Sequence, residues 1–135
     1  MKKEFVKNWK SSKQPRKQRK YLANAPISIK KKFLSVNLSK ELREKYKKRN
    51  IPVRKGDVVK IMRGKFKGKK AKIIQVSIKN SKVIIENIQV KKRDGSNANI
   101  KFQPSNLQIT ELNLEDKKRV KKLTKSNTKS EEKSK

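Results

Sequence analysis

Residues 55–76 read KGDVVKIMRGKFKGKKAKIIQV. Residues 57–62 predict a short, half-buried strand, because alternate positions of an extended chain share a face. A second extended run, rich in β-branched residues, follows at residues 72–76. Between them Gly64 and Gly68 bracket a basic turn, and glycine allows positive φ and a close approach of the backbone to a phosphate. The stretch predicts a β-hairpin suited to holding structured RNA or, taken alone, an ordinary hairpin with a solvated turn.

The composition points to a polyanionic partner. The chain has 135 residues, 42 Lys and Arg against 11 Asp and Glu, and a formal net charge of +31. Such a charge repels itself unless a polyanion neutralises it, so nucleic acid or an anionic membrane is the expected partner. No apolar stretch is long enough for a membrane span, and membrane insertion is not expected. With 31% hydrophobic residues, we expect one small domain with basic extensions.

Catalytic chemistry has few candidate residues. The chain contains no Cys and no His, which removes disulfides, thiolate zinc sites and the commonest general base. The carboxylates Asp57, Glu86, Asp94 and Glu111 are scattered and form no paired constellation. We therefore expect no enzyme, no metal and no cofactor. Asp57 follows Gly56 at a strand start, where a hydrogen bond that stabilises the turn is its expected role.

Three regions differ in composition. Residues 1–52 hold 18 basic and 3 acidic residues without a continuous strand pattern, and predict an extended basic leader with one short helix. Residues 53–112 hold 15 basic and 4 acidic residues and nearly all the strand-like sequence, so a small, mainly β barrel is expected there. Residues 113–135 hold 9 basic and 4 acidic residues and predict a basic helix with a disordered tail.

The leader contains two features of its own. Residues 13–20 form a basic stretch that cannot bury enough apolar surface to fold alone, and are expected to order only on a partner. Ser39 is expected to cap a helix over residues 40–49. Leu42 and Tyr46 stand four residues apart in it, and their expected role is to clamp this helix onto the barrel.

The strand pattern continues beyond the quoted stretch. Residues 81–88 predict a strand, and residues 90–93 and 100–103 predict a hairpin across the turn signal at residues 94–97. Residues 107–110 predict the last strand. Short strands with turns at this spacing favour a small barrel over a flat sheet. The expected core residues are Val58, Ile61, Ile73, Val76, Ile84, Ile88 and Ile109.

The last region is expected to begin with a helix. Asn113 is the expected cap, and residues 114–123 have helical spacing with Glu115 and Asp116 in the first turn. Beyond Lys125 the composition predicts disorder.

The glycine-bounded turn resembles the KOW motif, whose known setting is a small SH3-like barrel. The flanking segments are more specific: residues 12–20, 24–26 and 38–46 resemble the leader of one ribosomal family, and residues 103–109 resemble its Pro-Ser-Asn element. By these motifs the chain is identified as a member of the large-subunit ribosomal protein twenty-four family, in its archaeal and eukaryotic form, numbered twenty-six in eukaryotes. The resemblance extends from about Lys10 to Leu123.

This resemblance implies a structural and assembly role. Members of the family bind large-subunit ribosomal RNA early in assembly and sit near the mouth of the peptide exit tunnel. The implied partners are this RNA, neighbouring large-subunit ribosomal proteins and factors that dock at the exit tunnel. We expect a cytoplasmic protein of the ribosome, and no homo-oligomer.

The candidate RNA-binding residues are basic, aromatic or glycine. Lys and Arg neutralise phosphates, aromatic rings stack on bases, and glycine lets the backbone approach. The set is Trp9, Lys13, Arg16, Lys17, Arg19, Lys20, Lys55, Arg63, Gly64, Lys65, Phe66, Lys67, Gly68, Lys69 and Lys70. Residues 16–20 are expected to thread between RNA helices. Trp9 is the best stacking candidate, Phe66 an expected contact at the turn tip, and Phe102 an expected packing residue.

Two other functions compete. A KOW-containing transcription elongation factor, or a general RNA-binding factor, would use the same turn, but an elongation factor normally has a preceding mixed α/β domain. A nucleic-acid packaging protein fits the charge, yet packaging tails need neither a barrel nor a glycine-bounded hairpin.

Overall fold

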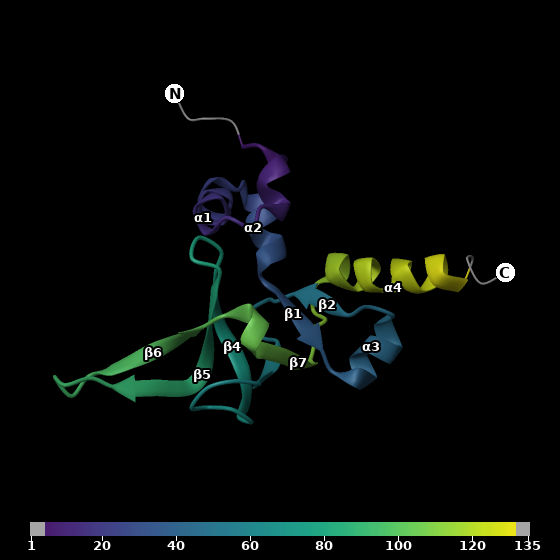
Figure 1. Ribbon diagram of the computed structural model, residues 1–135. Coiled ribbons are helices and arrows are strands. Elements are labelled where there is room, and N and C mark those ends of the chain that lie inside the picture. The colour runs from purple at the N-terminus through teal and green to yellow at the C-terminus, as the bar shows by residue number, and fades with distance from the viewer. Residues whose placement is uncertain (1–4, 132–135) are drawn as a thin grey trace.

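The computed structural model describes residues 5–131, with the backbone alone for Lys7 and residues 125–131. Seven strands form one sheet in the order β2-β1-β7-β3-β4-β5-β6, with β1 parallel to β7 and the other pairs antiparallel (Figure 1). The strands are β1 (Ser35–Leu38), β2 (Asn50–Pro52), β3 (Val58–Ile61), β4 (Lys70–Ser77), β5 (Lys82–Lys91), β6 (Asn97–Phe102) and β7 (Leu107–Glu111). The helices are η1 (Lys7–Ser11), α1 (Pro15–Asn24), α2 (Ile27–Phe33), α3 (Lys40–Tyr46), η2 (Pro104–Asn106) and α4 (Lys117–Glu131).

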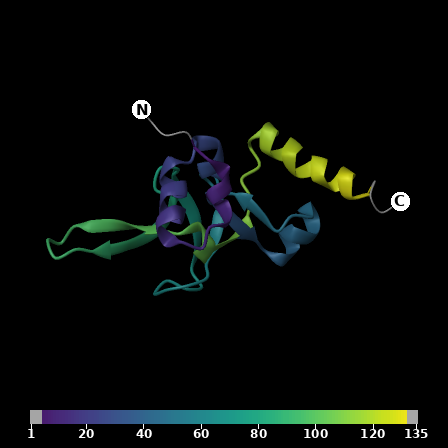
Figure 2. The ribbon, with the colours of Figure 1, turned by 45° about the horizontal axis from the view of Figure 1, so that its top comes forward.

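The mainly β, barrel-like architecture is confirmed. The quoted stretch forms β3 and β4, which pair antiparallel as expected. The two strands expected at residues 81–88 and 90–93 are a single strand, β5. Together with β6 it makes a long hairpin that projects from the rest of the molecule, on the side opposite α4, in both ribbon views (Figures 1 and 2). We call this hairpin, from residue 86 to residue 99, the arm.

The core differs from the expected one in two strands, β3 and β5. Ile61, Ile73, Ile88 and Ile109 are buried as predicted, and Val76 packs partly buried against them. The assignments of Val58 and Ile84 are wrong. Val59 is buried in place of the first, and Val83 and Ile85 are buried in place of the second.

A bulge explains the second error. Asn87 has φ +57° and lies where the register of β5 against β6 shifts. An extra residue of this kind reverses the alternation of faces, so that Ile85 and Ile88 both reach the core although they are three positions apart. A strand of uninterrupted period two would have put one of them outside.

The leader is more regular than its sequence predicts. The expectation of an extended segment without strands is wrong: residues 15–24 and 27–33 are helices, and residues 35–38 and 50–52 are strands of the sheet. Val36 and Leu38 are buried, and the parallel pairing of β1 with β7 fixes them there. A strand of four residues shows only two inward positions, which is too short for a clear periodic signal. The division of the chain at residues 52 and 112 stays a prediction.

Helix α3 behaves largely as predicted. The side chain of Ser39 accepts a hydrogen bond from the backbone N–H of Leu42, at 3.4 Å, and so caps the helix. Tyr46 belongs to the buried core, with Leu42 packed against it, which confirms the clamp. The helix ends at Tyr46, before the predicted end at residue 49, because Lys47 takes a left-handed conformation, φ +50°.

Helix α4 begins later than predicted. Asn113 instead closes a turn, in which its side-chain oxygen accepts from the backbone N–H of Glu115 at 2.9 Å. Asp116 takes the capping place and accepts from the backbone N–H of Lys118 at 2.8 Å. The helical backbone extends to Glu131, past Lys125 where disorder was expected, and residues 132–135 lie outside the described part.

A glycine before β3 provides a stability test. Gly56 has φ +92°, and a Cβ there would lie 2.6 Å from the Asn113 side-chain nitrogen, whereas Gly95 has φ +82° with nothing within 4 Å. We expect Gly95→Ala to lower the free energy of unfolding by about 1–2 kcal/mol, for the left-handed backbone alone. Gly56→Ala should lower it further, because Asn113 must also move. Urea unfolding of both variants measures the difference, and equal losses would contradict the prediction.

Candidate nucleic-acid interface

The basic turn, residues 62–69, is built by its own backbone. The N–H of Gly68 donates to the carbonyl of Ile61 at 2.8 Å, and that of Lys67 donates to the carbonyl of Gly64 at 3.0 Å. The N–H of Met62 donates to the carbonyl of Asn106 at 2.8 Å, which ties the turn to the loop before β7. All of these bonds join backbone atoms, so none of them uses a side chain of the turn.

The two glycines of the turn are required by conformation. Gly64 has φ +88° and Gly68 φ +90°, a region that other residues rarely adopt. A Cβ at either position would meet nothing within 4 Å. The outer side of the turn is therefore open, which leaves room for a ligand to approach the backbone.

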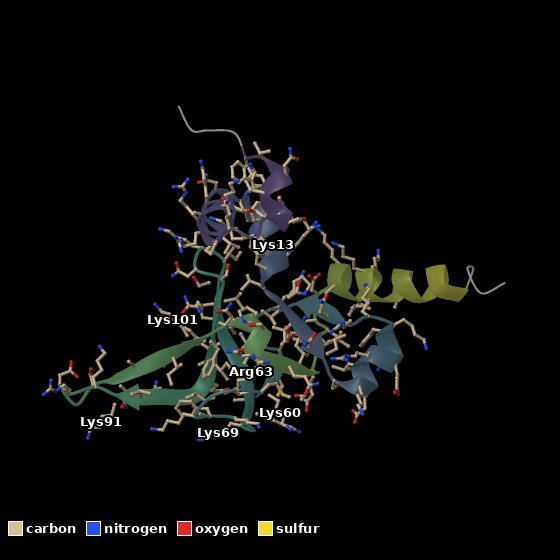
Figure 3. The ribbon with its side chains drawn as sticks, viewed as in Figure 1. Lys13, Lys60, Arg63, Lys69, Lys91 and Lys101 are labelled. Carbon is tan, nitrogen blue, oxygen red and sulfur yellow. The ribbon has the colours of Figure 1, made fainter. Side chains whose placement is uncertain are left out.

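The cations of the turn face solvent. Arg63, Lys65, Lys67, Lys69 and Lys70 are all exposed, and Lys55 is exposed ahead of β3. Figure 3 shows Lys60, Arg63 and Lys69 near one another in the lower part of the molecule in that view. The turn thus presents several ammonium and guanidinium groups without a carboxylate among residues 62–70.

Phe66 packs against the core, and its expected role as an RNA contact stays a prediction. Its ring is half-buried against the core and packs edge-on to Phe102, with ring centroids 6.4 Å apart. The ammonium of Lys69 lies 5.6 Å from the Phe66 centroid. Phe66 therefore anchors the turn to β6, and Phe102 packs at the core's edge as expected.

The basic leader segment is a helix. Arg16, Arg19 and Lys20 are exposed on α1, which corrects the expected extended threading segment, and Lys13 is exposed just before it. Pro15 occupies the first turn, where its missing N–H needs no partner. The side-chain amide of Gln18 donates to the carbonyl of Ser12 at 2.6 Å, with longer contacts to those of Trp9 and Lys10.

Trp9 lies on η1 beside this helix. The ammonium of Lys17 is 4.6 Å from the centroid of the Trp9 ring, a cation–π contact, and Lys17 is accordingly half-buried. The leader and the turn are separate groups of candidates, contributed by different elements.

The arm carries cations that the sequence analysis did not select. Lys91, Lys92 and Arg93 lie at its tip. Lys101 lies on β6 outside the arm, and Figure 3 labels it together with Lys91. The N–H and hydroxyl of Ser96 donate to Asp94 and lower the pKa of that carboxyl. A basic triplet next to the Asp-Gly turn signal was the available clue.

Arg119 lies in the predicted basic helix but is buried. Its Nη1 donates to Oδ1 of Asp57 at 2.6 Å and its Nη2 to Oδ2 at 2.8 Å, while the two side chains are 5% and 0% exposed. Asp57 also accepts from the backbone N–H of Arg54, at 2.8 Å, which confirms its turn-stabilising role. A bidentate pair joins α4 to the start of β3.

Further contacts hold α4 in place. Leu123 is buried in the core cluster, and Lys48 donates to the carbonyl of Lys122 at 2.7 Å. Burial lowers the pKa of Lys48, and the nearby charge of Lys122 lowers it further. The C-terminal helix is therefore part of the fold, and its exposed cations among the described side chains are Lys117, Lys118, Lys121 and Lys122.

Comparison with protein families now adds to this geometry. Residues 12–126 match the family described as the eukaryotic ribosomal proteins L26 and their archaeal counterparts, numbered twenty-four. The chain belongs to this family. It is a protein of the large ribosomal subunit, as its leader and turn motifs predicted. The match includes α1, the turn, the arm and the start of α4, and leaves Phe5, Val6 and η1 outside.

The helices and the acidic side chains bear on two other kinds of function. None of the helices within residues 5–131 is long and apolar enough to cross a membrane. Across the same part of the chain, no group of His, Cys, Asp and Glu side chains could hold a metal ion.

Proposed function

We propose that this ribosomal protein binds large-subunit ribosomal RNA directly, through cations presented by the basic turn, by α1 and by the arm. The observation that carries the proposal is the placement of exposed Lys and Arg on three separate elements of a chain with net charge +31. Widely spaced cations match an RNA whose phosphates surround the protein better than one short duplex.

The chemistry favours neutralisation and recognition of shape. Contacts with phosphate release condensed counterions, which gives affinity without sequence specificity. Lysine, the more abundant cation here, acts as a point charge, whereas arginine suits bidentate contacts. Base edges of an RNA duplex lie in a deep, narrow groove, so the protein would recognise loops, bulges and backbone geometry.

The finer role follows from the family resemblance. We propose that the chain supports early assembly of the large subunit and lies near the peptide exit tunnel, next to other large-subunit proteins, on ribosomes of the cytoplasm. A non-enzymatic role agrees with a family of structural ribosomal proteins. The arm and helices α1 and α2 of the leader would be suited to bridging RNA segments, because both extend from the sheet (Figure 1).

Sedimentation tests the proposal. Cell lysate is separated on a sucrose gradient before and after a wash at high salt, and the chain is followed across the fractions. We expect it in the large-subunit peak in both gradients, because many coupled contacts must break together. Release by the wash, or a peak with RNA polymerase, would instead support a loosely bound or transcriptional KOW factor.

A further inference from the structure

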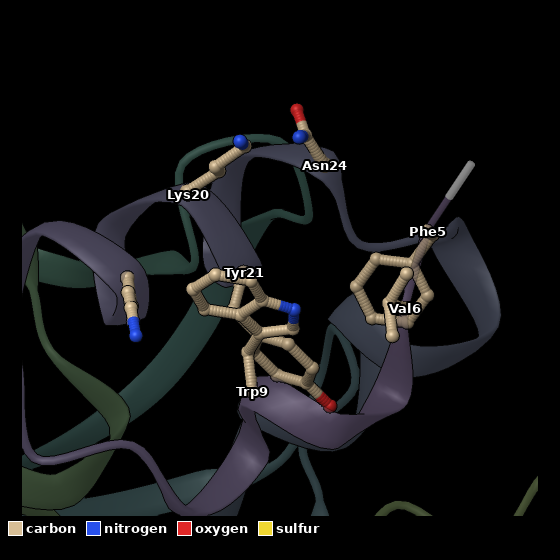
Figure 4. A pocket seen from close by; sticks show the side chains of 7 residues that line it. Phe5, Val6, Trp9, Lys20, Tyr21 and Asn24 are labelled. Carbon is tan, nitrogen blue, oxygen red and sulfur yellow. The ribbon is translucent and has the colours of Figure 1, made fainter. Parts of the chain in front are cut away.

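The leader forms a half-open pocket of about 440 Å³, which is in the range of small-molecule sites, about 300–1,000 Å³. We call it the leader pocket. Aromatic rings line its interior, and Figure 4 shows the Trp9 ring in its centre with Lys20 and Asn24 along one rim. The lining residues used below are Phe5, Trp9, Lys17, Lys20, Tyr21 and Asn24.

The leader's own contacts hold the pocket together. Phe5 and Tyr21 pack with ring centroids 5.0 Å apart, and Tyr21 meets Phe33 edge-on at 6.0 Å. Gln18 fastens the end of η1 to α1 through the carbonyl of Ser12. Two of the lining residues, Phe5 and Trp9, precede the residues that match the family. The family match therefore does not include the whole pocket.

The charge around the leader pocket indicates which kind of ligand it could bind. Between Lys7 and Asn24 the sequence has seven Lys and Arg and no Asp or Glu. Lys17 and Lys20 stand at the pocket itself, and Arg16 and Arg19 are exposed on the same helix. An apolar occupant with attached negative charge fits this combination, and the ligand class that unites a flat aromatic ring with phosphates is a nucleotide.

We propose that the leader pocket takes up one unstacked base of the bound RNA; this rests on the proposed RNA-binding function. Trp9 is 36% exposed, and its indole supplies the stacking surface. The ammonium of Lys17, 4.6 Å from the ring centroid, and that of Lys20 supply charge for the flanking phosphates. The Asn24 amide at the rim offers one acceptor and two donors to the edge of a base.

Fluorescence can report the site directly, because Trp9 is the chain's single tryptophan. The full chain is titrated with a single-stranded RNA of about ten nucleotides and, separately, with an abasic oligonucleotide of equal length and charge. Binding of both is followed by the anisotropy of a label on the oligonucleotide. We expect both to bind and only the base-containing RNA to quench Trp9 strongly. Equal emission changes at saturation would overturn the pocket assignment while leaving RNA binding intact.

Variants add a second readout. Trp9→Ala should weaken binding of the base-containing RNA by roughly 5- to 140-fold and leave the abasic affinity unchanged. Trp9→Phe, the matched control, should retain most of the affinity because a ring remains. A Trp9→Ala variant that binds both oligonucleotides as tightly as the parent chain would overturn the proposal. Failure of the parent chain to bind either one would overturn the proposed function as well.

Discussion

Arg119→Ala is expected to lower the free energy of unfolding by about 3–5 kcal/mol, because it leaves a buried carboxylate without its cation. Asp57 is fully buried and would keep only the backbone N–H groups of Arg54 and Asn113 as partners. The loss is a large share of the 5–15 kcal/mol that typically stabilises a small domain. Helix α4 should separate from β3 first, since the pair joins these two elements.

A neighbouring ion pair provides the control. Arg54 pairs with Asp116, at the start of the same helix, but these side chains are 39% and 35% exposed. Solvent screens such a pair, so Arg54→Ala should lower the free energy of unfolding by only about 0–1 kcal/mol. Urea unfolding followed by far-UV circular dichroism measures both variants. Similar losses for the two would show that the buried pair adds nothing beyond a surface contact.

Much of the barrel could be predicted because its signals are local. Alternation, β-branched residues and the turn glycines locate β3 and β4, and the Asp-Gly signal locates the hairpin of β5 and β6. Which face of each strand is buried depends less on local sequence. Asn87 carries the bulge in a left-handed conformation, and nothing in a regular alternating pattern marks the position where it reverses.

The leader shows why tertiary context can override a segment's own composition. Apart from Pro15, residues 13–20 contain no apolar side chain, yet α1 forms because Tyr21 lies against Phe5 and Phe33 and because Gln18 reaches back to η1. Those contacts involve partners outside the basic stretch itself, between 6 and 16 positions away along the chain. A window of basic residues cannot reveal them.

The buried arginine was obscured by its neighbours. Arg119 follows two lysines, and a run of three cations on a helix usually faces solvent. The sequence did contain one indication that this residue differs from its neighbours. Arg119 is the one arginine after Arg93, and a planar guanidinium suits a bidentate ion pair. Asp57 could be assigned to a turn, but its second partner lies 62 residues further on.

Affinity for a fragment of large-subunit ribosomal RNA is expected to fall by about 10³–10⁵-fold between 50 and 200 mM salt, if the chain contacts six to ten phosphates. The exposed cations on the turn, α1 and the arm can supply contacts of that number. Each phosphate contact contributes about 0.7–0.9 to the slope of log affinity against log salt. Filter binding at several salt concentrations measures the slope, and a nearly flat dependence would contradict binding through phosphates.

A pair of triple variants tests whether the basic turn contributes in particular. Replacing Arg63, Lys65 and Lys67 by alanine should reduce the slope by about 2–3, because these cations surround an open, glycine-bounded turn. Replacing Lys117, Lys118 and Lys121, equally exposed on α4, removes the same charge from outside the candidate set and should change the slope little. If both triple variants reduced the slope by the same amount, RNA affinity would depend on the total charge of the protein. The turn would then contribute no more to the interface than other exposed cations.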